Sequence, residues 1–201
     1  METVKIGNLE WSTENLNTTE FLNGDNIPMV KTPEAWKKAG EQESPACAIY
    51  GFDNSYMAHF GILYNYYALL DQRKLFDSGW RIPTNDDWKN LILEAGGVES
   101  DIIRRYTGAG NRIKSKENWL NASNGSNDYG FNAFPAGMIS QWGSSFNIYE
   151  RAYFWSATEL NSIQAYYFQI SKDDLDDDCY TNIESSFEKS AGLSVRRVKD
   201  V

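Results

Sequence analysis

The chain has 201 residues, of which 41% are hydrophobic and 14% aromatic, so it can bury a sizeable core in one domain or two small ones. Its formal net charge of -9 at pH 7 argues against nucleic-acid binding and against docking to anionic lipid, since both need basic surfaces. No apolar run is long enough to span a membrane, and no secretory signal is visible.

Short extended segments and short helices alternate in the first third of the chain. Residues 4–11 alternate loosely between apolar and polar side chains and predict a first strand. Residues 32–39 begin with Thr, Pro and Glu, which are helix start signals, and Gly40 ends this helix. We expect a short strand at residues 47–50 and a helix at residues 64–70.

The strongest local signal is a turn that leads into a capped helix. Pro83 holds the residue before it in an extended conformation. Thr84 can cap the following helix, and Asp87 supplies an acidic variant of the capping box. Apolar residues at helical spacing over residues 88–95 give this helix one buried face, and residues 96–97, both Gly, end it.

The second half of the chain reads as loops followed by strands. Residues 98–106 predict another helix. Residues 111–149 lack long periodic runs but contain recurring aromatic side chains, which disordered segments lack, so we expect an ordered, loop-rich region. Three strand candidates close the chain, at residues 153–158, 165–170 and 193–198.

Five sequence blocks, in this order, resemble one known family. They are WSTENLN at 11–17, GWRIPT at 79–84 with Trp88, GFNAFPAG at 130–137, FWSATE at 154–159 and GLSVRRVKD at 192–200. The set resembles the Fibrobacter succinogenes major paralogous domain, which is similar in turn to the formylglycine-generating enzymes; both are placed in the C-type lectin fold superfamily. The resemblance implies one domain over residues 1–201 with an α+β, C-type-lectin-like fold: short antiparallel strands, two main helices and long ordered loops.

The resemblance also carries expectations about location and function. Family members are typically secreted or surface-anchored proteins of Bacteroidetes and relatives, often lipoproteins. We therefore expect an extracellular or cell-surface location, a possible lipid anchor in the precursor, and a signal sequence removed ahead of Glu2. We expect a non-catalytic binding or adhesion module for glycan or protein ligands. A divergent enzyme of the formylglycine-generating superfamily and a purely structural domain of a surface lipoprotein stay open as alternatives.

Two positions depart from the family pattern together. Relatives often carry Cys where this chain has Asp77 and Arg197. If those cysteines form a disulfide in relatives, an ion pair between Asp77 and Arg197 is one replacement, and two unrelated surface residues are the other. The chain's own cysteines, Cys47 and Cys179, either pair or remain free thiols, because spacing does not decide between these states.

The residues that carry chemistry are few. His59 is the single histidine, so a structural or exposed role is expected rather than a catalytic one. Formylglycine-generating chemistry needs reactive or copper-binding thiols near the end of the chain. Cys179 stands there alone in an acidic run, and negative neighbours raise a thiol pKa and blunt its reactivity. No catalytic residue and no enzymatic activity are expected.

The acidic run at residues 173–178 suggests calcium, whose preferred ligands are hard oxygen atoms. An EF-hand starting at Asp174 fails, because Cys179 takes the place of the required Gly and Ser185 the place of the bidentate Glu. A looser calcium site at Asp174, Asp176 and Asp178 stays open beside a solvated acidic loop, and no other cofactor is expected.

Aromatic and amide side chains are the better functional lead, because sugars stack on rings and bind Asn, Asp and Gln through their hydroxyl groups. The ligand-binding candidates are Trp142, Tyr149, Asn161, Gln164, Tyr166, Asp174, Asp176 and Tyr180, with Tyr153 of the same chemical type. The candidates from Asn161 to Tyr180 lie in the segment between the strand candidates at residues 153–158 and 193–198, and we expect their side chains to be exposed on one face. Some proteins of this fold diversify surface residues near this end of the chain. An ordinary hydrated loop is the alternative.

Overall fold

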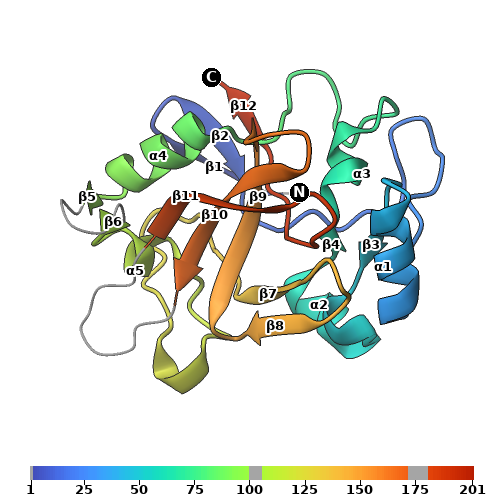
Figure 1. Cartoon of the computed structure of the whole chain (residues 1–201). Helices are drawn as coiled ribbons and strands as arrows, with labels where there is room; N and C mark the ends of the chain where they lie inside the picture. The colour runs from blue at the N-terminus through green and yellow to red at the C-terminus, as the bar shows by residue number, and fades with distance from the viewer. Residues whose placement is uncertain (1, 100–105, 172–180) are drawn as a thin grey trace.

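A five-stranded antiparallel sheet, of order β5-β6-β11-β10-β9, runs through the structure (Figure 1). This computed structural model describes residues 2–99, 106–171 and 181–201. The sheet consists of β5 (Val98–Glu99), β6 (Tyr106–Thr107), β9 (Arg151–Glu159), β10 (Gln164–Ser171) and β11 (Thr181–Glu188). Its three long strands come from the last quarter of the chain and form the frame on which the other elements pack.

Smaller sheets surround this frame in the part of the chain that the structure describes. The first and last strands share one sheet of order β1-β2-β12, made of β1 (Thr3–Ile6), β2 (Leu9–Ser12) and β12 (Val198–Asp200). Two hairpin-like pairs are β3 (Cys47–Ala48) with β4 (Leu63–Tyr64) and β7 (Ala136–Ile139) with β8 (Ser145–Ile148). The chain is therefore a mixed α/β protein of mostly short antiparallel strands.

Two longer helices stand out among the short ones. The helices are α1 (Pro33–Glu41), α2 (Met57–Phe60), α3 (Tyr66–Leu70), α4 (Asn85–Glu94) and α5 (Gly110–Ile113), with 3-10 turns at Tyr50–Phe52, Asn54–Tyr56 and Leu120–Ala122. The predicted capping box of α4 is confirmed, because Thr84 Oγ1 accepts from the Asp87 amide at 3.2 Å and Asp87 Oδ2 from the Thr84 amide at 2.7 Å. No helix within the described ranges has the length and apolar character to cross a membrane.

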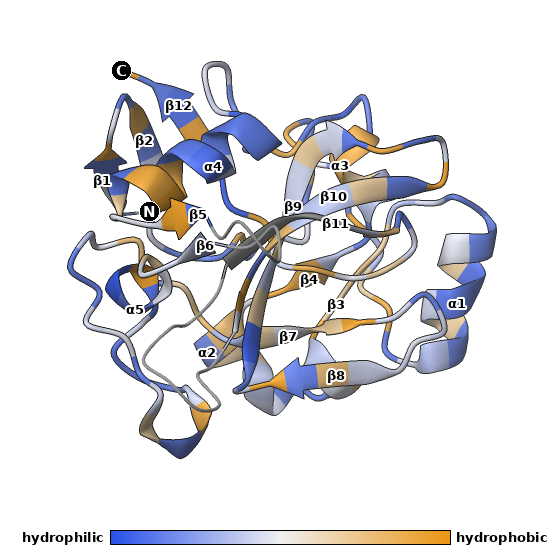
Figure 2. Ribbon diagram, turned by 60° about the vertical axis from the view of Figure 1, so that its left-hand side comes forward, coloured by the Kyte–Doolittle hydropathy of each residue, from blue (hydrophilic) through white to orange (hydrophobic). Residues whose placement is uncertain are grey.

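The core below α4 is built from stacked aromatic rings. Trp88 of α4 lies 4.6 Å from Phe168 and 5.6 Å from Phe154, measured between ring centroids, and 5.0 Å from Trp11 of β2. All four side chains are buried. Figure 2 shows hydrophilic residues over much of the visible ribbon of α4. Asp86, Asn90 and Glu94 of this helix are exposed, while the buried Trp88 joins the two larger sheets.

Several sequence expectations need correction. Residues 4–11 form a hairpin rather than one strand, because Gly7 adopts a φ of 62° between β1 and β2. The helix predicted at residues 98–106 is wrong at both ends, where β5 and β6 pair with each other, and residues 100–105 lie outside the described ranges. The last strand begins at Val198 rather than at residue 193, and the residues before it make only isolated bridges.

Candidate functional site

A groove of about 180 Å³ opens beside the exposed indole of Trp142. It is lined by Lys37, Gly40 and Glu41 of α1, Tyr67 of α3, Gln141 and Trp142 of the β7–β8 turn, Ile163 before β10, Glu188 of β11, and Ser190. We call this set the Trp142 groove. Pockets that enclose a drug-sized ligand measure about 300–1,000 Å³, so this groove suits one small group of a larger ligand.

The β7–β8 turn holds Trp142 in place. The Gly143 amide donates to the Ser140 carbonyl at 2.9 Å and closes the turn. Gly143 has a φ of 87°, and a Cβ atom there would lie 2.6 Å from Cα of Pro33, so the turn packs directly on the start of α1 (Figures 1 and 2). Trp142 is 64% exposed, although its neighbours in the turn are fixed. The exposed side chain of Ile163 lines the same groove, so Trp142 belongs to an exposed apolar patch larger than one side chain, which is the kind of feature that marks binding grooves.

Lys37 already places an ammonium group over this ring. Its Nζ atom lies 5.6 Å from the centroid of Trp142 and 3.6 Å from Glu41 Oε1. Both charged side chains are substantially exposed. Trp142 therefore accepts a cation on its face within the structure itself.

Glu188 supplies the polar wall opposite α1. Its two carboxylate oxygens accept from Gln141 Nε2 and from Ser190 Oγ, each at 3.5 Å, which is the long limit of a hydrogen bond. No cation lies within ion-pair distance of this half-buried carboxylate in the residues that the structure describes, since the neighbouring Lys189 binds Glu159 at 2.8 Å. Within the described part of the chain, neutral donors alone hold the carboxylate of Glu188.

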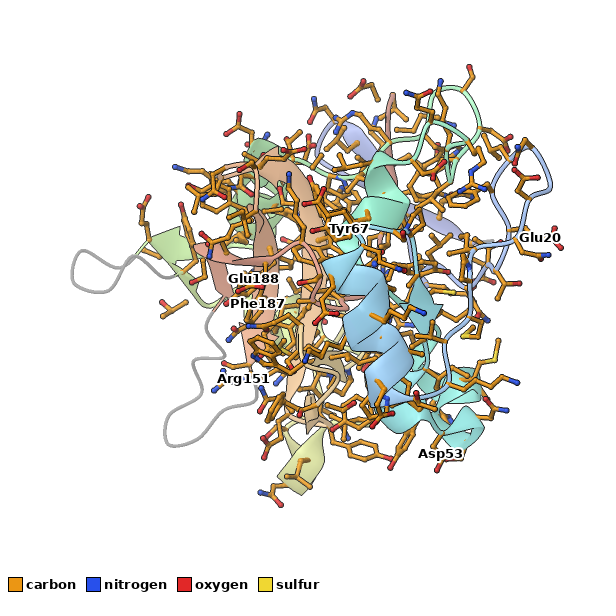
Figure 3. The ribbon with its side chains drawn as sticks, turned by 45° about the vertical axis from the view of Figure 1, so that its right-hand side comes forward. Glu20, Asp53, Tyr67, Arg151, Phe187 and Glu188 are labelled. Carbon is orange, nitrogen blue, oxygen red and sulfur yellow. The ribbon has the colours of Figure 1, made fainter. Side chains whose placement is uncertain are left out.

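Tyr67 lies close to this carboxylate. Burial raises the pKa of the Tyr67 phenol, and the negative charges of Glu43 and Glu188 raise it further. The phenol is therefore a neutral hydrogen-bonding group at pH 7. Figure 3 shows Tyr67 and Glu188 on the side of the molecule where α1 comes forward. The groove thus combines one aromatic face with hydroxyl, amide and carboxylate groups.

Gly40 allows the floor of the groove to form. A Cβ atom at this position would lie 2.7 Å from Cβ of Ser190, so only glycine permits this approach of α1 to the segment after β11. The sequence predicted Gly40 as the end of a helix and gave no sign of this contact. The groove residues other than Trp142 were missed for the same reason, because they come from distant segments without a shared motif.

A second cavity, of about 230 Å³, lies between the segment after β2 and α2, and His59 is among its lining residues. Behind it, the buried guanidinium of Arg196 donates to Asn15 Oδ1 at 2.9 Å and to the Asn132 carbonyl at 2.7 Å. The amide nitrogen of Asn15 donates to the Phe60 carbonyl at 2.9 Å. The buried amide that lines this cavity is therefore committed to the fold, which makes the Trp142 groove the stronger candidate site.

The family model of the Fibrobacter succinogenes major domain matches residues 4–199. The chain belongs to this family. No curated protein and no solved structure matches the chain. The family assignment predicted from the five sequence blocks is confirmed, and the Trp142 groove is a feature of this Fibrobacter succinogenes major domain.

The predicted ligand-binding residues of this domain separate into different places. Trp142 lines the groove, and Asn161 and Gln164 flank its residue Ile163. Asn161 Oδ1 accepts from the amides of Ile163 and Gln164 at 2.8 and 2.9 Å, and its Nδ2 donates to Gln164 Oε1 at 3.2 Å. These two amide side chains therefore shape the turn before β10 and do not line the groove.

The tyrosine candidates do not join Trp142. Tyr149 packs on Phe60 at 5.4 Å between ring centroids, in a separate aromatic cluster. Tyr153 is only 2% exposed, so its suggested role as a ligand contact is wrong. Tyr166 is half-buried on β10, opposite Ser186. The remaining candidates, Asp174, Asp176 and Tyr180, lie outside the described residues, as do Asp178 and Cys179.

Cys47, and the two positions at which relatives often carry Cys, Asp77 and Arg197, have structural roles. Cys47 is a buried free cysteine, and burial raises the pKa of its thiol to about 12. Arg197 lies over the ring of Trp80 at 4.4 Å and forms no ion pair with Asp77 in this structure, so the suggested ion-pair replacement is wrong. Within residues 2–99, 106–171 and 181–201, no group of three His, Cys, Asp or Glu side chains is arranged to hold a metal ion.

Proposed function

We propose that this domain is a non-catalytic, surface-displayed binding module and that the Trp142 groove binds a sugar unit of a glycan. The carrying observation is the exposed indole of Trp142, fixed by its turn and bordered by Gln141, Glu188 and Ser190. An indole face takes the apolar side of a sugar ring, and the polar groups take its hydroxyl groups. The small volume of the groove favours one sugar unit over an extended protein surface.

The wider setting of this proposal comes from the family resemblance. The short antiparallel strands and two longer helices support a C-type-lectin-like fold, which holds variable loops on a fixed frame. The same resemblance supports an extracellular location with a lipid anchor. The enzyme alternative depends on Cys179, which lies outside the described residues.

A glycan array probed with the wild-type domain and with Trp142→Ala tests the proposal. We expect a defined set of glycans to bind the wild type and to lose at least about tenfold in affinity in the variant, as a central aromatic contact does. Phe146→Ala is the matched control, because Phe146 is 49% exposed on β8 but does not line the groove. Wild-type binding that survives in Trp142→Ala, or the absence of any bound glycan, would contradict the proposal.

A further inference from the structure

The groove contains more negative than positive charge. Glu41 and Glu188 each contribute a carboxylate, and among the described residues Lys37 is the one cation that lines it. The domain as a whole carries a net charge of -9. Clefts lined by an excess of one sign favour ligands of the opposite sign, so an anionic sugar is disfavoured and a cationic one is favoured.

The acidic groups of this region are not equivalent. Glu41 lies 3.6 Å from Lys37 Nζ, and Glu159 lies 2.8 Å from Lys189 Nζ. Among the described residues, the hydrogen-bond donors to the Glu188 carboxylate are the neutral groups of Gln141 and Ser190, both at 3.5 Å. A charged donor makes a stronger hydrogen bond to a carboxylate than a neutral one does. Glu188 is therefore the acidic group of the groove that gains most from an added ammonium group.

The arrangement around Lys37 shows what such a ligand would meet. The Lys37 ammonium lies between a carboxylate, Glu41, and the face of an indole, Trp142. Glu188 and Trp142 line the same groove, so a second carboxylate faces the space beside this indole. A ligand ammonium seated between Trp142 and Glu188 would make the same two kinds of contact that Lys37 makes.

From this juxtaposition we infer that the sugar taken by the Trp142 groove carries a free, protonated amino group, as a hexosamine unit without its acetyl group does. This inference rests on the proposed glycan-binding function. The indole face receives the amine-bearing edge of the sugar ring, and the carboxylate of Glu188 pairs with the ammonium group that lies between them. Lys37 then competes with the ligand for the indole face.

The test compares three oligosaccharide series with the same linkage that differ at one ring position: glucosamine, N-acetylglucosamine and glucose oligomers. Titrations followed by calorimetry are run at about pH 6, below the pKa of about 7.7 that is usual for an α-amino group. We expect the amine series to bind the wild type about tenfold more tightly than the other two, from one ion pair and one cation–π contact. Added salt should reduce this preference.

Two variants move the preference in opposite directions. Glu188→Gln keeps the shape and an oxygen acceptor but removes the charge, so the preference for the amine series should disappear. Lys37→Met removes the competing ammonium, so the amine series should bind more tightly than it binds the wild type. Glu20→Gln is the matched control, because Glu20 is an exposed acid far from Glu188 in Figure 3, and the preference should remain.

The outcomes separate this inference from the proposed function. Equal binding of all three series, or a preference for the neutral ones, would overturn the amine inference and leave the glycan-binding function standing. A preference that persists in Glu188→Gln would also overturn the inference. If none of the three series binds and the glycan array is also blank, both proposals fail. Melting temperatures of the variants identify any loss of fold.

Discussion

Replacing Arg196 by Met should cost this domain a large part of its stability. Arg196 is fully buried and has no carboxylate partner among the described residues. Its guanidinium donates to Asn15 Oδ1 and to the backbone carbonyls of Ser12, Phe131 and Asn132 at 2.6–2.9 Å. Burial lowers the pKa of Arg196 to about 9, so the group is still cationic at neutral pH.

The magnitude follows from these four bonds. A hydrogen bond from a charged donor contributes about 1.5–3 kcal/mol, which gives about 6–12 kcal/mol for four of them before the desolvation of the ion is counted. Several kcal/mol of desolvation offset this sum, because Met avoids burying a charge. The variant leaves three buried oxygens and one part-buried oxygen without this donor. We therefore expect the free energy of unfolding to fall by about 3–5 kcal/mol.

Urea unfolding followed by tryptophan fluorescence measures this loss, since Trp11, Trp88 and Trp155 are buried. Arg197→Met is the matched control, because the guanidinium of Arg197 mainly lies over Trp80, and it should lose about 1 kcal/mol. A loss below about 1 kcal/mol for Arg196→Met, with an unchanged slope against urea, would refute the view that this cation holds distant segments together.

Three further predictions concern packing and pH. Gly143→Ala should destabilise the domain by about 1–3 kcal/mol and weaken binding at Trp142. The new methyl group would collide with Pro33, and residue 143 has a positive φ that alanine adopts only with strain. An unchanged melting temperature would contradict this. Burial raises the pKa of the Cys47 thiol, so above about pH 9 the thiol ionises in the unfolded chain before it ionises in the folded one. The free energy of unfolding should therefore fall by about 1.4 kcal/mol near pH 10. Urea titrations at several pH values measure this fall with pH, which Cys47→Ala should reduce. Burial opposes the ionised form of Asp87, but hydrogen bonds from Arg81 outweigh it and leave the pKa of this carboxyl lowered. The free energy of unfolding should therefore fall as the pH drops below about 4. Acid unfolding measures this fall, which should be smaller in Asp87→Asn.

Local signals predicted the fold where a few adjacent residues decide the structure. Thr84 and Asp87 determine the start of α4 through contacts within one turn, and this helix forms where it was predicted. Residues 4–11 were less informative, because one positive-φ glycine turns a strand into a hairpin without changing the apolar pattern. Residues 111–149 are ordered and loop-rich as expected, with Phe131 in the core.

The side of a strand that faces solvent was harder to predict. All residues from Ala152 to Ser156 on β9 are buried, because the strand is covered on both faces, and such strands lack the alternation that separates inside from outside. Tyr153 was therefore counted among the side chains suited to ligand contact although it is buried. The Trp142 groove escaped prediction for a different reason: Glu188, Tyr67 and Gly40 meet only after α1, α3 and β11 have packed together.

The sheet that joins β2 to β12 has a consequence for how the chain acquires its structure. Val198 pairs with Trp11, and Leu9 with Asp200, so two strands at opposite ends of the sequence are neighbours. Contacts between residues so distant along the chain slow folding, since a long loop must close before they form. During synthesis, β1 and β2 leave the ribosome well before β12 does, so their sheet stays incomplete until β12 has been made. Until then β2 exposes an unpaired edge, the kind of surface that chaperones protect from aggregation.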